Sequence, residues 1–163
     1  PPDLSWLVSP DTPRGFGLLE PYALLVPGGS AHRLEKRWPA GRYAQFALEL
    51  SRQGLRPVFI GGPDEAALAG EMTDNTPGML NLMGRTSFAD IVSLAAGAAL
   101  AVGNDTGPMH LIAAAGAPAL ALFSAASDPA LTAPRGPRVA VLRRPSLDQL
   151  HVQEVLEAAQ DLA

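Results

Sequence analysis

Short apolar runs recur along the chain, and each of them ends at a polar or glycine-bearing turn. They are rich in Ala, Leu and Val, which is typical of strands that a parallel sheet buries on both faces. We therefore expect a series of short, fully buried strands. These predicted strands are residues 22–26, 56–60, 79–82, 98–102, 117–123 and 138–142.

Helical periodicity and helix-end signals lie between the apolar runs. Pro39 suits the first turn of a helix, apolar residues then recur at helical spacing, and Gly54 closes the segment. Residues 87–90 (Ser to Asp) and 146–149 (Ser to Gln) both fit the capping box that opens a helix. The predicted helices are residues 39–53, 66–72, 88–96, 111–115 and 147–163.

The repeated order of strand, turn and helix predicts an α/β fold with a doubly wound, mostly parallel, Rossmann-like sheet. Right-handed crossovers place every strand-to-helix loop along one edge of such a sheet, where ligands bind. Eight polar or glycine positions fall on this edge: Ser30, Lys36, Glu65, Gly84, Asp105, Thr106, Gly107 and His110.

Residues 1–20 differ from the rest of the chain because they are rich in proline and lack clear periodicity. We interpret them as a linker or docking arm. Residues 21–163 are then expected to form one Rossmann-like domain, as a chain of 163 residues allows.

Composition and charge exclude several classes of protein. With no cysteine, the chain has neither disulfides nor thiolate metal ligands, and a cytoplasmic location is expected. A net charge of −4 with no basic patch disfavours nucleic-acid binding. The 12 basic residues are 11 arginines and one lysine, Lys36, which lies in the loop after the first strand.

Residues 102–110, Val-Gly-Asn-Asp-Thr-Gly-Pro-Met-His, join a predicted strand to a helix. Gly107 lets a ligand approach the backbone, and helix N-termini attract anions. Asp105 and Thr106 can either cap the helix or contact a ligand. His110 can donate to a phosphate or sugar, although its spacing favours a core histidine.

Phosphate chemistry is the simplest use of this edge. Ser30 in a glycine turn, the helix N-terminus and Lys36 together suit a diphosphate, and Lys36 would offset the charge of a leaving diphosphate. Glu65 suits a ribose or sugar hydroxyl pair, but Asp64 and Glu65 also complement a helix dipole. Neither the P-loop pattern nor the GxGxxG pattern is present.

Two other chemistries are disfavoured. Asp105 and His110 are five residues apart with no further ligand at a conventional spacing, so no metal site is expected. A serine hydrolase would need the Gly-x-Ser-x-Gly turn, which is absent. His151 is expected in the last helix, with its side chain in solvent.

Over residues 22–160 the chain resembles the C-terminal domain of the ADP-heptose:lipopolysaccharide heptosyltransferases, glycosyltransferase family 9. The order and spacing of several short motifs carry the resemblance. They are residues 27–30 (Pro-Gly-Gly-Ser), 36–39 (Lys-Arg-Trp-Pro), 61–65 (Gly-Gly-Pro-Asp-Glu), 81–84 (Asn-Leu-Met-Gly), 103–110 (Gly-Asn-Asp-Thr-Gly-Pro-Met-His) and 122–129.

The resemblance implies the donor-binding, C-terminal half of a GT-B fold. In that family pattern Ser30 and Lys36 contact the diphosphate and Glu65 the ribose, while the segment from Leu82 to Gly84 frames the base. Asp105, Thr106 and Gly107 lie against the sugar-phosphate, with His110 nearby. The loop around Ala31 and His32 is one residue longer than in the family pattern, and Ser124-Ala-Ala replaces its Gly-Pro-Thr.

The resemblance also implies an inverting transfer of heptose from ADP-heptose to the lipopolysaccharide core, with no metal or other cofactor required. The acceptor would be a lipid-linked oligosaccharide at the inner face of the inner membrane. An N-terminal domain would bind this acceptor and supply the general base, so we expect these 163 residues alone to bind donor without transferring sugar. Two alternatives stay open: a GT-B transferase that uses a UDP- or GDP-sugar, and a non-catalytic nucleotide-binding module.

Overall fold

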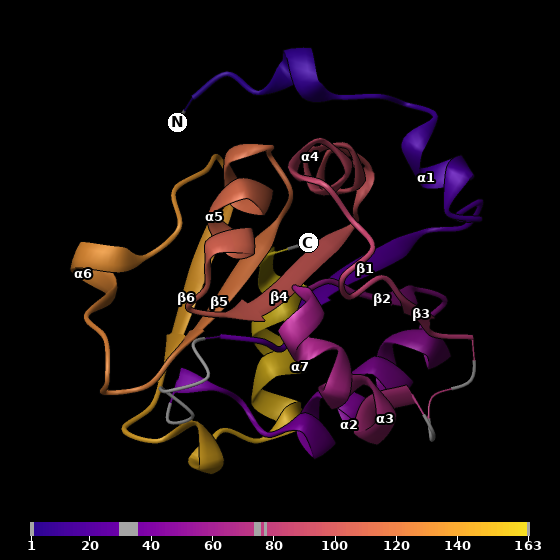
Figure 1. Ribbon diagram of the computed structural model, residues 1–163. Helices are drawn as coiled ribbons and strands as arrows, with labels where there is room; N and C mark the ends of the chain where they lie inside the picture. The colour runs from indigo at the N-terminus through magenta and orange to yellow at the C-terminus, as the bar shows by residue number, and fades with distance from the viewer. Residues whose placement is uncertain (1, 30–35, 74–75, 77, 163) are drawn as a thin grey trace.

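The computed structural model describes residues 2–29, 36–73, 76 and 78–162. Over these residues, six parallel strands form one sheet in the order β3-β2-β1-β4-β5-β6 (Figure 1). The doubly wound parallel sheet expected from the alternation of elements is therefore confirmed. The strands are β1 (Tyr22–Val26), β2 (Arg56–Phe59), β3 (Leu80–Asn81), β4 (Leu100–Asn104), β5 (Ala119–Phe123) and β6 (Val139–Arg143).

Helices cover both faces of the sheet (Figure 1). Helices α2, α3 and α7 pack on one face, and α4 and α5 pack on the other. Successive strand residues alternate between the two cores, so that Leu25 packs under α2 while Leu24 packs under α4. The α-helices are α1 (Thr12–Gly15), α2 (Ala40–Arg52), α3 (Ala69–Thr73), α4 (Phe88–Gly97), α5 (Gly107–Ala114), α6 (Pro129–Thr132) and α7 (Val152–Leu162).

The N-terminal segment crosses the outside of α4, as Figure 1 shows. It contains a 3₁₀ turn, η1 (Ser5–Leu7), as well as α1. The Ser93 hydroxyl in α4 donates to the carbonyl of Leu7 at 3.2 Å and accepts from the backbone N–H of Ser9 at 2.8 Å. These two bonds satisfy a buried hydroxyl and attach residues 7–9 to the helix.

The helix starts agree with the sequence in part. Ser87 and Asp90 form the predicted capping box, and α2 ends before Gly54, which has a φ of +85°. The helix predicted from residue 66 instead begins as a 3₁₀ segment, η3 (Pro63–Leu68), because Pro63 starts the turn early. Residues 124–137, which connect two of the predicted strands, contain the short helix α6, which Asp128 caps.

The capping box predicted at residues 146–149 is wrong. The Ser146 hydroxyl accepts from Asp148 N, and the turn η4 (Leu147–Gln149) ends at Leu150, whose backbone is extended. Side chains of α2 and the segment before it occupy the Leu150 carbonyl, which is therefore lost to a continuing helix. Helix α7 starts only at Val152, so His151 precedes the helix and does not lie within it.

Candidate functional site

The site begins at the point where the sheet changes direction. Strand β1 lies between β2 and β4, and the chain proceeds outward from it on both sides, so the carboxyl ends of β1 and β4 form the switch point at which folds of this kind bind ligands. Lys36 follows β1 and Asp105 follows β4. Lys36 Nζ lies 3.2 Å from Asp105 Oδ2, and the two side chains are only 20% and 10% exposed. A partly shielded ion pair therefore lies at the switch point.

The N-terminus of α5 opens beside this pair. Thr106 occupies the N-cap position with extended backbone, but its hydroxyl makes no capping bond, and the Asp105 carboxylate is engaged with Lys36. The capping interpretation of these two side chains is therefore wrong. The Thr106 hydroxyl is buried without a partner among the described residues, which is rare for a buried polar atom. A Cβ on Gly107 would meet no atom of the described residues within 4 Å, so this part of the structure leaves the helix mouth open.

Gly29, in the glycine turn after β1, lies close to the side chains of Arg37 and Thr106. Arg37 Nη2 donates to the carbonyl of Gly29 at 2.8 Å. A Cβ on Gly29 would lie 3.7 Å from Arg37 Nε and 3.9 Å from Thr106 Cγ2. Arg37 Nε is, like the Thr106 hydroxyl, buried and unpaired within the described part of the chain. The predicted diphosphate contact Ser30 lies outside the described residues, as does His32.

Glu65 joins the loops after β1 and β2. Its Oε2 accepts from the backbone N–H of Gly62 at 2.6 Å, which caps η3 and confirms the helix-end role weighed for this residue. A Cβ on Gly28 would lie 2.2 Å from Glu65 Cδ, and one on Gly61 would lie 2.4 Å from Oε2. Glycine at both positions therefore leaves the space that the carboxylate fills.

The segment after β3 presents one of its predicted contacts and buries the other. Leu82 is fully buried in the core under β2, so its side chain has no surface to offer a ligand. Gly84 is exposed, has a φ of +73°, and donates its N–H to the carbonyl of Gly61 at 2.8 Å. This bond brings the loop after β3 to the loop after β2.

His110 is exposed on α5, so the core interpretation favoured by its spacing is wrong. The helix turns Met109 and Ile112 inward instead. His110 lines a groove of about 560 Å³ between α5, the segment after α6 and the N-terminal residues. The rest of its lining is mostly apolar and comprises Pro2, Leu4, Leu111, Ala114, Leu131, Ala133 and Arg135.

Asn104 has no predicted role from the sequence, although the structure places it at the centre of the site. Its Oδ1 accepts from the Tyr43 hydroxyl at 2.7 Å and from the backbone N–H of Trp38 at 3.1 Å. Its Nδ2 donates to the carbonyls of Pro27 at 2.8 Å and Gly28 at 3.0 Å. The available signal was a polar residue at the end of an apolar strand, since asparagine is depleted in strands.

Burial also keeps Tyr43 in its protonated form. The side chain is fully buried, and this desolvation raises the pKa of the Tyr43 phenol well above its usual value. The hydroxyl therefore remains a donor to Asn104 throughout the neutral range.

The described residues contain no group of three or more His, Asp or Glu side chains that is placed to hold a metal ion. Among the described helices, none combines the length and the apolar character needed to cross a bilayer.

A doubly wound parallel sheet with a helix N-terminus at its switch point defines a Rossmann-like domain. Residues 8–160 match the model of glycosyltransferase family 9 (heptosyltransferase), and the chain belongs to this family.

Two kinds of relative agree with this assignment. Lipooligosaccharide heptosyltransferase 2 of Haemophilus influenzae and lipopolysaccharide heptosyltransferase 2 of Escherichia coli are each 33% identical over 113 residues, which is 66% of this chain. The structure of E. coli ADP-heptose lps heptosyltransferase II matches 93% of the chain with a TM-score of 0.84 and 30% identity. E. coli heptosyltransferase WaaC with ADP matches 87% of it with a TM-score of 0.79 and 27% identity.

These relatives are longer than the part that matches. The sequence alignments cover 32% of the two curated heptosyltransferases, and the structural matches cover 49% and 44% of the two solved chains.

Proposed function

We propose that this chain binds the nucleoside diphosphate sugar of an inverting heptosyltransferase, with ADP-heptose as the donor. The observation that carries the proposal is the Lys36–Asp105 pair beside the open N-terminus of α5, next to the unpaired Thr106 hydroxyl. A diphosphate is the ligand for which an ammonium, a hydroxyl and free helix N–H groups are jointly suited. One relative, E. coli heptosyltransferase WaaC, has been solved with ADP and with ADP-2-deoxy-2-fluoro heptose.

In the proposed reaction an acceptor hydroxyl attacks the anomeric carbon of the heptose from the face opposite the diphosphate. The bond between the anomeric carbon and the diphosphate oxygen breaks, and the leaving ADP takes the electron pair. Lys36, Thr106 and the first N–H groups of α5 would stabilise the charge that develops on the diphosphate. Asp105 would orient Lys36 by accepting one of its three N–H bonds.

We further propose roles for the neighbouring loops. The carboxylate of Glu65 would contact the ribose, and the backbone around exposed Gly84 would border the base, because the buried Leu82 side chain cannot. Ser30 would contact the diphosphate, and His110 would lie near the sugar. The acceptor, a lipopolysaccharide core, and the general base would be contributed through an N-terminal domain, at the cytoplasmic face of the membrane.

Calorimetric titration of this chain with ADP, UDP and GDP, at matched salt and without metal, tests the proposal. ADP is expected to bind best. Lys36→Ala should weaken ADP binding by about 1.5–3 kcal/mol, or roughly 10- to 150-fold, because it removes a charge-assisted bond. Arg52→Ala is the matched control, because it removes one positive charge from the exposed end of α2 and should leave the affinity unchanged.

Each other outcome has a definite meaning. Preferential binding of UDP or GDP would mean that the donor is a UDP- or GDP-sugar and not ADP-heptose. An unchanged ADP affinity in Lys36→Ala would favour a nucleotide-binding module in which Lys36 does not bind the diphosphate. Sugar transfer by the 163 residues alone would contradict the proposed need for a second domain.

A further inference from the structure

We propose that Asn104 is a positioning residue that holds the Lys36–Asp105 pair in the geometry that donor binding requires. This inference rests on the function proposed above. Asn104 is the last residue of β4 and is fully buried. Its side-chain amide has two acceptor lone pairs and two N–H donors, and all four are used. A buried amide with every bond made is fixed in one orientation.

The four bonds connect three segments that bear the proposed ligand contacts. The carbonyls of Pro27 and Gly28 begin the glycine turn after β1. The backbone N–H of Trp38 lies two residues beyond Lys36. Asp105 is bonded covalently to Asn104 itself. Both charges of the ion pair are therefore close in the chain to a group that Asn104 fixes. Asp105 is the residue after Asn104, and Lys36 lies two residues before the hydrogen-bonded N–H of Trp38.

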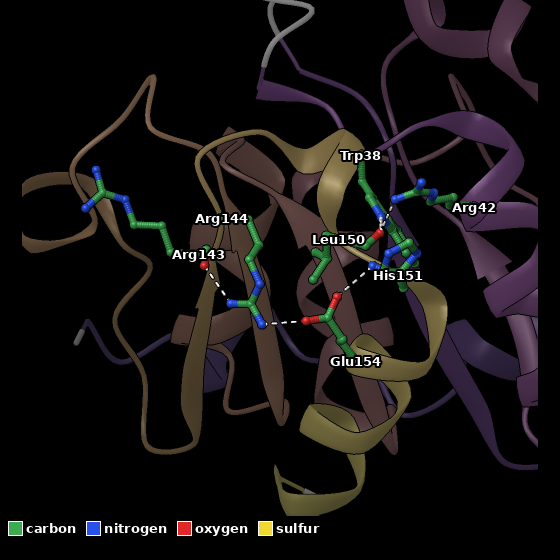
Figure 2. Close-up of polar contacts among 7 residues, drawn as sticks. All are labelled: Trp38, Arg42, Arg143, Arg144, Leu150, His151 and Glu154. Carbon is green, nitrogen blue, oxygen red and sulfur yellow. Dashed lines mark hydrogen bonds and ion pairs between the residues drawn. The ribbon is translucent and has the colours of Figure 1, made fainter.

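Trp38 supplies the rigid partner that this role requires. It is 1% exposed, and its indole N–H donates to the carbonyl of Leu150 at 2.8 Å. Arg42 donates to the same carbonyl, as Figure 2 shows. The indole also packs edge-to-face on Tyr43 with ring centroids 4.9 Å apart. The segment after Lys36 is thus fixed from two sides, by Asn104 and by Leu150.

The pattern of donors explains why an amide is needed at this position. Aspartate has nearly the same shape, but it would place a second oxygen against the carbonyls of Pro27 and Gly28, where Nδ2 now donates. Alanine would leave those two carbonyls and the N–H of Trp38 without their partner. Either change should release the turn after β1 from the Lys36 segment.

The single lysine of the chain makes this inference testable without a ligand. Acylation by a water-soluble amine reagent, followed by peptide mass spectrometry, reports how accessible Lys36 is and separates it from the N-terminal amine. In the folded wild type the ion pair with Asp105 should slow the reaction. Asp105→Asn, which removes the partner charge directly, provides the rate for a released Lys36.

We expect Asn104→Asp and Asn104→Ala to raise the Lys36 acylation rate toward that of Asp105→Asn. The same variants should weaken ADP binding by about tenfold or more, as is typical when a supporting hydrogen-bond partner is removed. Leu94→Ala is the control, because it truncates a buried core side chain in α4 outside this network. It should leave the acylation rate of the folded protein unchanged, although it lowers the melting temperature.

Folded Asn104 variants that retain the wild-type acylation rate would overturn the positioning role. If neither variant folds, Tyr43→Phe removes the hydroxyl that donates to Asn104 Oδ1, and a wild-type acylation rate in that variant would overturn the positioning role equally. A raised rate with unchanged ADP affinity would reject the link to donor binding. Failure of the wild type to bind ADP would count against the proposed function alone, since the acylation assay needs no nucleotide.

Discussion

The two halves of the carboxyl edge of the sheet are built differently. Around β1, β2 and β4, side chains bond to the backbone: buried Asn104 joins the end of β4 to the loop after β1, Arg37 bonds the carbonyl of Gly29, and Glu65 caps η3. Around β5 and β6, the loop carries the short helix α6 and borders a mostly apolar groove where Leu131 is 79% exposed. The difference between the two halves is burial: the bonds of Asn104 are buried, whereas those that Asp128 and Arg143 make in the β5–β6 half are exposed.

This difference indicates where geometry matters. Hydrogen bonds fix the orientation of the groups they join, whereas apolar contacts tolerate small rearrangements. A ligand that needs several polar groups at defined positions therefore fits the β1–β4 half. The groove beside β5 and β6 offers shape and apolar area, with His110 and Arg135 as its charged or titratable lining.

The largest loss of stability is expected on the β5–β6 side. A Cβ on Gly136 would lie 2.1 Å from the carbonyl oxygen of Ala113, which is backbone in α5. Gly136→Ala should therefore cost about 1–3 kcal/mol of unfolding free energy, measured by urea denaturation. If the two halves are independent, ADP affinity in the folded variant stays at the wild-type value, and a large loss of affinity would break the comparison.

Alkaline pH should act on both cores through the only two tyrosines. Burial raises the pKa of Tyr22 to about 12 and that of Tyr43 well above its usual value. Because both pKa values rise on folding, their contribution is complete below about pH 10 and is lost above it, by about 1.4 kcal/mol per pH unit for each tyrosine. Denaturation curves between about pH 9 and pH 11 measure this slope.

Tyrosine variants assign that slope to the two sides. Tyr43→Phe and Tyr22→Phe should each remove about half of it. Only Tyr43→Phe should also change the nucleotide site, because its hydroxyl binds Asn104, whereas Tyr22 donates to the carbonyl of Leu94 at 2.6 Å. An undiminished slope in both variants would contradict the assignment.

Gly28→Ala should lower the unfolding free energy less than Gly136→Ala does, but it should lower the ADP affinity more. The new Cβ would meet the flexible end of Glu65, which can turn away at the expense of its bond to the N–H of Gly62. We expect a loss of about 1 kcal/mol in unfolding free energy and a clear loss of ADP affinity by calorimetry. Gly41→Ala is the control for added bulk alone, since Gly41 is exposed on α2 and its Cβ would meet no atom of the described residues within 4 Å.

The smallest effect is expected at His110. Its side chain is exposed on the groove side of α5, so His110→Ala should change the unfolding free energy and the ADP affinity by no more than about 0.5 kcal/mol each, or roughly twofold in Kd. Comparison of ADP with the ADP-sugar sharpens the result. A loss of affinity for the ADP-sugar alone would mean that the donor site extends toward the groove. A loss of affinity for ADP itself would contradict the separation between the β1–β4 half and the groove.

Much of this architecture was predictable because its causes are local. Apolar runs with Gly or Pro turns define strands within two or three residues, and the alternation of strands with helices determines a parallel sheet and its ligand-binding edge. The placement of Lys36, Glu65, Gly84 and Asp105 after four different strands follows from that order alone. The helix-end signals failed where a distant partner intervened, as at Leu150, whose carbonyl Trp38 and Arg42 occupy.

Sequence alone therefore determined the order of the elements, the edge of the sheet that carries the site and the residue types available there, because hydrophobicity and turn chemistry act between neighbours in the chain. Only the tertiary structure decided that Lys36 pairs with Asp105, that Asn104 joins three segments, that Leu82 is core and that His110 is exposed. Each of these depends on partners up to 77 residues away along the chain, whose distance and direction are set by the packing of the whole sheet.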